Sequence, residues 1–140
     1  MTAGSPQNQT AAKMKVLVIE DDKFLQRLLV MKLAQDGFDV VGASDGEDGL
    51  RRIVTEPPDL VVLDLILPKM DGFEVLTQMR TNSQTRDIPV IVLSNLGQEE
   101  DVSRVKQLGA MEFLTKSDIS IHEVVQKIKE ALARHLSQKK

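Results

Sequence analysis

Cysteine is absent from the 140-residue sequence. Its absence excludes a disulfide scaffold, a thiol nucleophile and a thiolate metal site, and it fits a reducing compartment. No apolar run reaches the roughly 18 residues that a membrane-spanning helix needs, and the N-terminal MTAGSPQNQTAAK lacks the apolar core of a secretion signal. The net charge of −3 offers no electrostatic basis for wrapping nucleic acid. We therefore expect a cytoplasmic protein with no direct contact to nucleic acid and no insertion into a membrane.

The length of the chain suits one domain, which can bury about two-thirds of the surface that its unfolded chain exposes. Small and polar residues dominate the N-terminus, so we expect a disordered tail over residues 1–13. One folded domain should cover residues 14–137, followed by a C-terminal tail over 138–140. The sequence shows no internal repeat and no second domain.

Short apolar runs alternate along the chain with longer segments of helical period. The runs that predict strands are 14–19, 38–43, 59–65, 88–93 and 110–114. The segments that predict helices are 22–36, 44–56, 72–80, 98–108 and the stretch after Ser120. This alternation predicts an α/β fold with a five-stranded parallel sheet covered by helices on both faces. The strands lack polar alternation, as expected for a sheet that is buried on both sides.

Polar side chains interrupt or follow four of the five predicted strands, near their C-terminal ends. They are Glu20, Asp21, Asp22, Asp64, Ser94 and Lys116. In an open parallel sheet, ligands bind at the edge formed by the C-terminal ends of the strands. We therefore expect these side chains to lie together at one edge of the sheet and to form a site.

The residue types in this set indicate phosphoryl chemistry at a hard cation. Two carboxylates about 4 Å apart repel by roughly 4 kcal/mol at an effective dielectric constant of about 20. A divalent cation would offset that repulsion, and carboxylates without Cys or His suit Mg²⁺. Asp64 would be a nucleophile, because carboxylates can form aspartyl phosphates. Lys116 and Ser94 would hold the transferred group, since positioning and charge neutralisation supply most of the catalysis in phosphoryl transfer.

Four segments, in this order and spacing, resemble the receiver domains of two-component response regulators. They are VLVIEDD, VVLDLILPKMDGFEVL, VIVLS and GAMEFLTK, and the resemblance covers about residues 14–136. It implies a doubly wound, flavodoxin-like fold with strand order 2-1-3-4-5, like that of the stand-alone chemotaxis regulators. It also implies a phosphoprotein of signal transduction that catalyses only its own phosphorylation and dephosphorylation, and is not otherwise an enzyme.

The resemblance assigns a role to each residue of the site. Asp64 is the phosphoacceptor, and Lys116 pairs with it and then with the phosphoryl oxygens. Mg²⁺ is held by Asp21, Asp64 and the backbone carbonyl of Ile66, with Glu20 acting through a water molecule. The switch residues are Ser94 and Phe113. Pro68, Asp71 and Gly72 shape the loop after the acceptor.

The implied partners are a phosphodonor and an output protein. The donor is a sensor histidine kinase or a phosphotransfer protein, and we expect the first helix, with Phe24 and Met31, to dock it, although partial burial of both side chains is the plainer expectation. Phosphorylation then changes a face that binds a downstream output protein. Because the last predicted helix ends in SQKK, we expect the output to lie in a partner or in a domain outside this chain. The pathway, whether motility, a phosphorelay or development, stays open.

Three competing readings fail on their motifs. The stretch DGEDGL lacks the spacing of a calcium loop. A P-loop needs a G-x-x-x-x-G-K-[ST] stretch, which this sequence does not contain. A phosphatase of the haloacid dehalogenase type needs a second Asp two residues after its nucleophile, where this chain has Ile66. A receiver-like interaction module that works without phosphorylation remains as the alternative function. Asp22 is read as a helix N-cap rather than as a metal ligand.

Two positions depart from the usual receiver pattern. A small residue normally follows the switch hydroxyl, and here it is Asn95, which brings access to the site into question. A proline with a cis peptide normally follows the lysine, and here it is Ser117. We expect a trans Lys116–Ser117 bond, because a non-proline cis bond costs about 3–4 kcal/mol. Ile66 and Leu96 are apolar at the positions that flank the attacking water, which predicts slow loss of the phosphoryl group.

Overall fold

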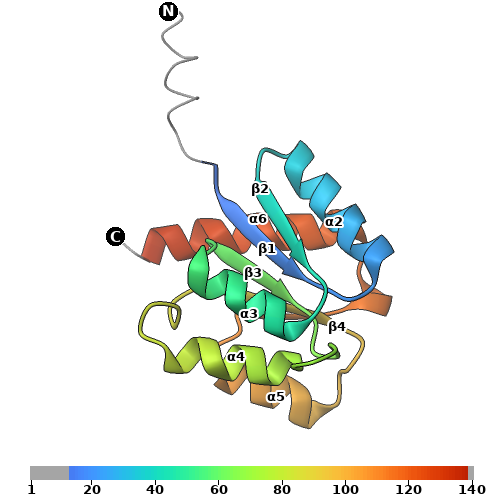
Figure 1. Cartoon of the computed structure of the whole chain (residues 1–140). Helices are drawn as coiled ribbons and strands as arrows, with labels where there is room; N and C mark the ends of the chain where they lie inside the picture. Colours follow the sequence, from blue (N-terminus) through green and yellow to red (C-terminus); the bar gives the residue numbers. More distant parts are fainter. Residues whose placement is uncertain (1–12, 139–140) are drawn as a thin grey trace, which may run out of the picture.

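The computed structural model describes residues 13–138, so the predicted N-terminal tail lies outside the described residues except for Lys13. The five strands are β1 (Lys15–Ile19), β2 (Asp39–Ala43), β3 (Leu60–Leu63), β4 (Val90–Ser94) and β5 (Glu112–Thr115). They form one parallel sheet in the order β2-β1-β3-β4-β5 (Figure 1). The predicted doubly wound α/β fold and its strand order are therefore confirmed.

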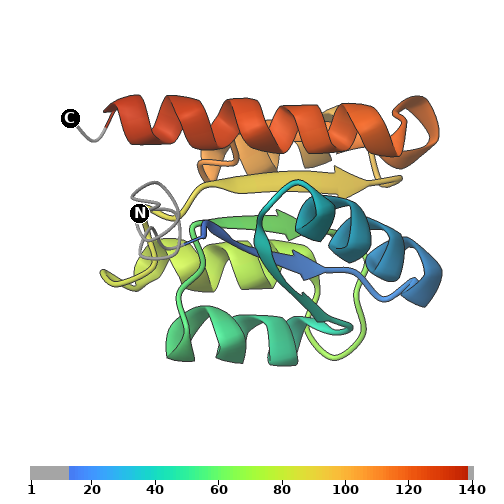
Figure 2. The same ribbon diagram turned by 90° about the horizontal axis from the view of Figure 1, so that it is seen from above.

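Helices follow each strand and cover both faces of the sheet. They are α2 (Lys23–Gln35), α3 (Gly46–Thr55), α4 (Gly72–Thr81), α5 (Glu99–Gln107) and α6 (Ile121–Gln138), with a 3-10 turn η1 (Lys116–Asp118) before α6. In Figure 2, α6 lies along one side of the sheet and α3 along the other. The final helix runs one residue past the domain end that we expected at 137. In the described part of the chain, no helix is both long enough and apolar enough to cross a membrane.

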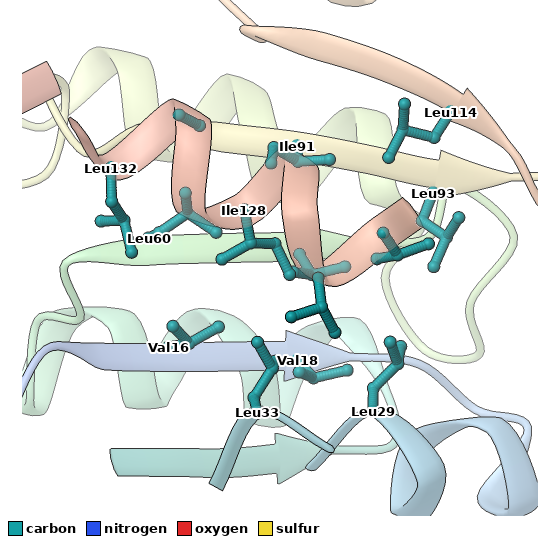
Figure 3. Close-up of a cluster of buried hydrophobic side chains, with 14 residues drawn as sticks. Val16, Val18, Leu29, Leu33, Leu60, Ile91, Leu93, Leu114, Ile128 and Leu132 are labelled. Carbon is teal, nitrogen blue, oxygen red and sulfur yellow. The ribbon is translucent and has the colours of Figure 1, made fainter. Parts of the chain in front are cut away.

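The core is divided by the sheet into two apolar clusters. Val16 and Val18 of β1 point into the cluster that α2 and α6 cover, together with Leu29 of α2 and Ile128 of α6 (Figure 3). Side chains of the opposite face, such as Ile19, pack in the cluster that α3, α4 and α5 cover. Because both faces are buried, strand residues of either parity are apolar, which explains the missing alternation in the sequence.

Local side-chain bonds fix where helices begin beside the C-terminal edge of the sheet. The Asp22 carboxylate accepts hydrogen bonds from the N–H groups of Phe24 and Leu25, at 3.0 and 3.2 Å. Its prediction as an N-cap is confirmed. At the start of α6, Ser120 Oγ accepts the Glu123 N–H at 3.1 Å, and the Glu123 carboxylate accepts the Ser120 N–H at 2.9 Å. This reciprocal pair is a capping box.

The loop after β3 is held by close packing against the start of α4. The Gly72 N–H donates to the carbonyl of Leu65 at 2.9 Å. A Cβ atom at position 72 would collide with the backbone carbonyl oxygen of Asp64, so glycine is required there. Asp71 caps α4 by accepting from the Glu74 N–H at 2.9 Å. The predicted role of the Asp71-Gly72 pair in shaping this loop is therefore supported.

Candidate functional site

The strand register brings the predicted site residues to one edge of the sheet. Ile19 of β1 pairs with Leu63 of β3, so Glu20 and Asp64 leave neighbouring strands at the same level. The sequence predicted Asp64 inside a strand over 59–65, but β3 ends at Leu63 and Asp64 comes directly after it. Ser94 ends β4 and is paired with Thr115, the residue before Lys116, so that β4 and β5 complete the edge.

Three carboxylates form the acidic part of the site. Ligand oxygens of Glu20, Asp21 and Asp64 all lie within 4.8 Å of one another. Glu20 and Asp64 are only 2% and 4% exposed, whereas Asp21 is exposed to solvent. An all-oxygen set that is buried on one side and open on the other fits Mg²⁺, which prefers carboxylates and retains several waters.

Lys116 supplies the positive charge that holds the acids together in this structure. Its Nζ atom lies 2.8 Å from Glu20 Oε1 and 2.8 Å from Asp64 Oδ2. The Lys116 side chain is 19% exposed, so its charge is only partly screened by solvent. One ammonium group therefore bridges the two buried carboxylates and offsets their mutual repulsion.

The pKa directions follow from this burial and pairing. Burial raises the pKa of Glu20 above its ordinary value, although hydrogen bonds from Lys116 and from the Asp22 N–H, at 3.0 Å, oppose the change. Burial alone would lower the pKa of Lys116, but its hydrogen bonds to Asp64 and Glu20 outweigh burial and raise it. Lys116 is therefore charged at neutral pH and stays available to an anionic group.

The phosphoacceptor candidate and the switch candidate have different surroundings. Asp64 Oδ2 binds Lys116, while Oδ1 accepts the Ile66 N–H at 3.3 Å. Ser94 is fully buried, and its Oγ atom accepts the Leu96 N–H at 3.2 Å within its own loop. Phe113 is half-buried in β5 beside Val92 of β4, packed against the cluster that α3, α4 and α5 cover.

The two unusual positions contact each other rather than the acids. The Asn95 Oδ1 atom accepts the backbone N–H of Ser117 at 3.0 Å. Residues 13–138 contain no cis peptide bond, so the predicted trans Lys116–Ser117 bond is confirmed. The turn η1, which contains both Lys116 and Ser117, was not predicted.

Sequence reasoning missed one residue that supports the site, Gln26. Its Nε2 atom donates to the carbonyl oxygens of Glu20 and Ala43, at 2.7 and 3.0 Å, and to Ser44 Oγ at 3.1 Å. The side chain thus ties α2 to the ends of β1 and β2. The available signal was a polar residue on the apolar stripe, three positions before the buried Leu29.

Two apolar residues of α2 are more exposed than expected. Phe24 is 77% exposed and Met31 is 50% exposed, so the expectation of partial burial was wrong for both. They lie seven positions apart on one helix, close to two turns, and therefore share a face. Phe24 begins this face only two residues after Asp22, at the acidic end of α2.

Comparison with known proteins identifies the family of the chain. The sequence matches the response regulator receiver domain over residues 16–129. The alkaline phosphatase synthesis transcriptional regulatory protein PhoP of Bacillus subtilis (strain 168) is 41% identical over 120 residues, which make up 86% of this chain and 49% of that protein. The chain spans about half the length of the curated relatives it matches.

Solved structures show the same relationship. The receiver domain of the Francisella response regulator 1452 superposes with a TM-score of 0.78 at 33% identity, covering 87% of this chain and 98% of that one. The Mn²⁺-bound form of response regulator Rcp1 gives a TM-score of 0.74 at 30% identity, covering 83% of this chain and 91% of that one. The chain therefore belongs to the response regulator receiver domain family of two-component signalling.

Proposed function

We propose that this receiver domain accepts a phosphoryl group on Asp64 and passes the signal to an output partner. The observation that carries the proposal is the ammonium of Lys116, 2.8 Å from the buried carboxylate of Asp64, at an edge of the sheet that also holds the buried Glu20 and the exposed Asp21. A carboxylate that is paired with a cation and open toward acidic metal ligands has the surroundings that a phosphoryl acceptor requires.

Mg²⁺ would be held by Asp21, Asp64 and the backbone carbonyl of Ile66, with Glu20 acting through a water molecule. The clustered carboxylate oxygens support this assignment, and the related Rcp1 has been solved with bound Mn²⁺. When bound, the cation supplies charge neutralisation for phosphoryl oxygens. One carboxylate oxygen of Glu20 contacts Lys116 and the other accepts the Asp22 N–H, which supports metal binding by Glu20 through water rather than directly.

The chain's own residues would carry the transfer step. An oxygen of the Asp64 carboxylate attacks the phosphorus of a phosphohistidine, the new O–P bond forms, and the P–N bond breaks. The leaving imidazole nitrogen keeps the bonding electron pair and takes a proton from water. Lys116 then moves its contact from the Asp64 oxygen to a phosphoryl oxygen, where its positive charge offsets the added negative charge. Water later hydrolyses the acyl phosphate, so the chain catalyses only reactions of its own side chain.

The signal would leave the site through Ser94 and Phe113. The Ser94 hydroxyl, whose Oγ accepts the Leu96 N–H, would move toward the phosphoryl group and donate its O–H to a phosphoryl oxygen, which shifts the loop after β4. The displaced loop would free space for the half-buried Phe113 ring to turn inward. The face formed by α5, β5 and α6 then changes between two states, biased by the new charge.

Two partners follow from this scheme. A sensor histidine kinase or phosphotransfer protein in the cytoplasm would dock on α2, where Phe24 and Met31 are exposed beside the acids. The output would be a downstream protein, or a further domain outside this chain. If α2 is the donor face, alanine at Phe24 and Met31 slows transfer from a phosphotransfer protein and leaves acetyl phosphate unaffected. Equal slowing with both donors would reject that face.

The direct test is incubation with acetyl phosphate and Mg²⁺, followed by intact-mass measurement. The proposal predicts a gain of one phosphoryl group in the native chain and none in Asp64→Asn. Thermal unfolding of both chains shows that the variant is folded. A folded native chain that takes up no phosphoryl group would favour the alternative, an interaction module that works without phosphorylation.

A further inference from the structure

The loops that follow β4 and β5 are joined by a side-chain bond between residues 95 and 117. The backbone N–H of Ser117 donates to Asn95 Oδ1 at 3.0 Å. The paired residues of the two strands end just before this point, at Ser94 and Thr115. The Asn95 side chain therefore extends the link between β4 and β5 into the site, past the end of the sheet. We call this contact the 95–117 bond.

Both ends of the 95–117 bond depend on the residues that this chain has at the two positions. A proline at 117 would have no N–H to donate. A small apolar residue at 95 would have no side-chain acceptor. These are the residue types that the receiver pattern led us to expect, and neither is present. The two departures from that pattern are therefore the two halves of one interaction.

The residues next to the 95–117 bond are the two that the proposed function places on the phosphoryl group. Lys116, directly before Ser117, places its ammonium 2.8 Å from Asp64. Ser94, directly before Asn95, is fully buried. Lys116 and Ser117 lie in η1, a 3-10 turn of three residues. So short a turn has few internal hydrogen bonds, and its position depends on contacts with neighbouring segments.

We infer that Asn95 is a positioning residue, which holds the backbone of Lys116 against β4 so that the ammonium stays on Asp64. The inference rests on the proposed function of Asp64 as phosphoacceptor. Asn95 is exposed and acts through Lys116 rather than on the phosphoryl group. The same bond ties the loop of Ser94 to the loop of Lys116, so the two phosphoryl contacts are set relative to each other.

Two substitutions at position 95 separate the hydrogen bond from the shape of the side chain. Asn95→Leu keeps a branched side chain of similar size and removes the acceptor. Asn95→Asp keeps an oxygen acceptor at the same position. Asn82→Leu is the matched control, because Asn82 Oδ1 also accepts a backbone N–H, from Gln84 at 2.9 Å, in the loop after α4. Neither Asn95 nor Asn82 is buried, so we expect all three variants to fold.

Nuclear magnetic resonance reports on the bond and on Lys116 without any phosphorylation. Amide hydrogen exchange of Ser117 should be about fivefold faster in Asn95→Leu, the ratio expected for one net hydrogen bond. It should be unchanged in Asn82→Leu, and protection should persist in Asn95→Asp. Contacts with two carboxylates slow the exchange of the Lys116 ammonium protons with water, which makes its nitrogen-15 signal observable. This signal should weaken in Asn95→Leu and in no other variant. Unchanged Ser117 exchange or an unchanged Lys116 signal in Asn95→Leu would overturn the inference.

Phosphorylation rates then connect the bond to the proposed chemistry. With acetyl phosphate and Mg²⁺, Asn95→Leu should react about fivefold more slowly than the native chain, and Asn82→Leu should match the native rate. Equal rates for all chains would contradict the positioning role. If no chain becomes phosphorylated, the proposed function fails, and the Ser117 and Lys116 signals still decide whether Asn95 positions the lysine.

Discussion

The Lys116 ammonium lies 2.8 Å from the Asp64 carboxylate, although the two residues are 52 positions apart in the sequence. The same ammonium lies 2.8 Å from Glu20, so one cation serves two carboxylates that are almost completely buried. Buried acids of like charge require such a partner. We therefore expect Lys116 to stabilise the fold before phosphorylation, in addition to its proposed contact with the phosphoryl group.

Removal of the lysine should be costly to stability in the absence of metal. Lys116→Met leaves both carboxylates without a cation, and we expect it to lower the free energy of unfolding by about 1–3 kcal/mol. The loss should be smaller when Asp64→Asn is already present, since one of the two carboxylate charges is gone. Urea denaturation of the native chain, the two single variants and the double variant measures the coupling between Lys116 and Asp64. Lys69→Met is the control, because Lys69 is exposed and lies 3.8 Å from Asp45. A Lys116 variant as stable as the control would contradict the bridging role.

The raised pKa of Glu20 predicts a pH dependence with a definite sign. The folded state holds a proton on Glu20 more readily than the unfolded state, whose pKa is near 4.5. The stability from this difference is fully present below pH 4.5 and is lost as the pH rises through the folded pKa. Glu20→Gln has no such loss, so its stability relative to the native chain should increase from pH 4.5 toward neutral pH. Urea denaturation without Mg²⁺ at both pH values tests the sign, and a decrease would contradict it.

Substitutions of the neighbouring residues Asp21 and Asp22 should affect metal binding and helix capping separately. Asp21→Ala should abolish Mg²⁺ binding and phosphorylation, yet leave the metal-free fold equally or slightly more stable, by about 0.5 kcal/mol, because repulsion is relieved. Asp22→Ala should lose about 1 kcal/mol of stability with the cap of α2 and still bind Mg²⁺. Titration calorimetry and thermal unfolding distinguish the two. A metal-free Asp21→Ala chain that melts below the native chain would reject the repulsion argument.

Ile66 and Leu96 should slow the loss of the phosphoryl group. Both are apolar and cannot orient an attacking water, and each 1.36 kcal/mol added to the barrier slows hydrolysis about tenfold. The combined Ile66→Asn and Leu96→Glu variant should therefore lose its phosphoryl group up to about tenfold faster than the native chain. Val54→Asn, an exposed apolar position on α3, is the control. If the double variant is no faster than that control, shielding by these two side chains does not set the lifetime.

The sequence was sufficient for the fold and for the side chains that gather at the C-terminal edge of the sheet. The alternation of apolar runs with segments of helical period predicted the parallel sheet. Ligands bind at the C-terminal edge of such sheets, and this rule predicted that Asp64, Ser94 and Lys116 lie at one edge. Asp22 was predicted as a cap because acids that follow a strand and precede an apolar stripe commonly have that role. These features are local, or follow from topology alone.

Features that depend on tertiary contacts were missed or predicted wrongly. Phe24 and Met31 lie off the stripe of Leu25, Leu29 and Leu33, but large apolar side chains are usually covered, and only the packed structure shows that these are not. Asn95 and Ser117 were each noted as departures from the receiver pattern. Their hydrogen bond joins positions 22 residues apart on neighbouring loops, and neither position signals the other in the sequence.

The most direct test of phosphoryl transfer to Asp64 identifies the modified side chain itself. After phosphorylation by acetyl phosphate with Mg²⁺, borohydride reduces an aspartyl phosphate to homoserine and releases phosphate, and peptide sequencing by mass spectrometry then locates the homoserine. Phosphoryl transfer to Asp64 predicts homoserine at position 64, in amounts that fall when Lys116 is replaced. Homoserine at position 21, or a reduced chain with aspartate intact at position 64, would contradict it.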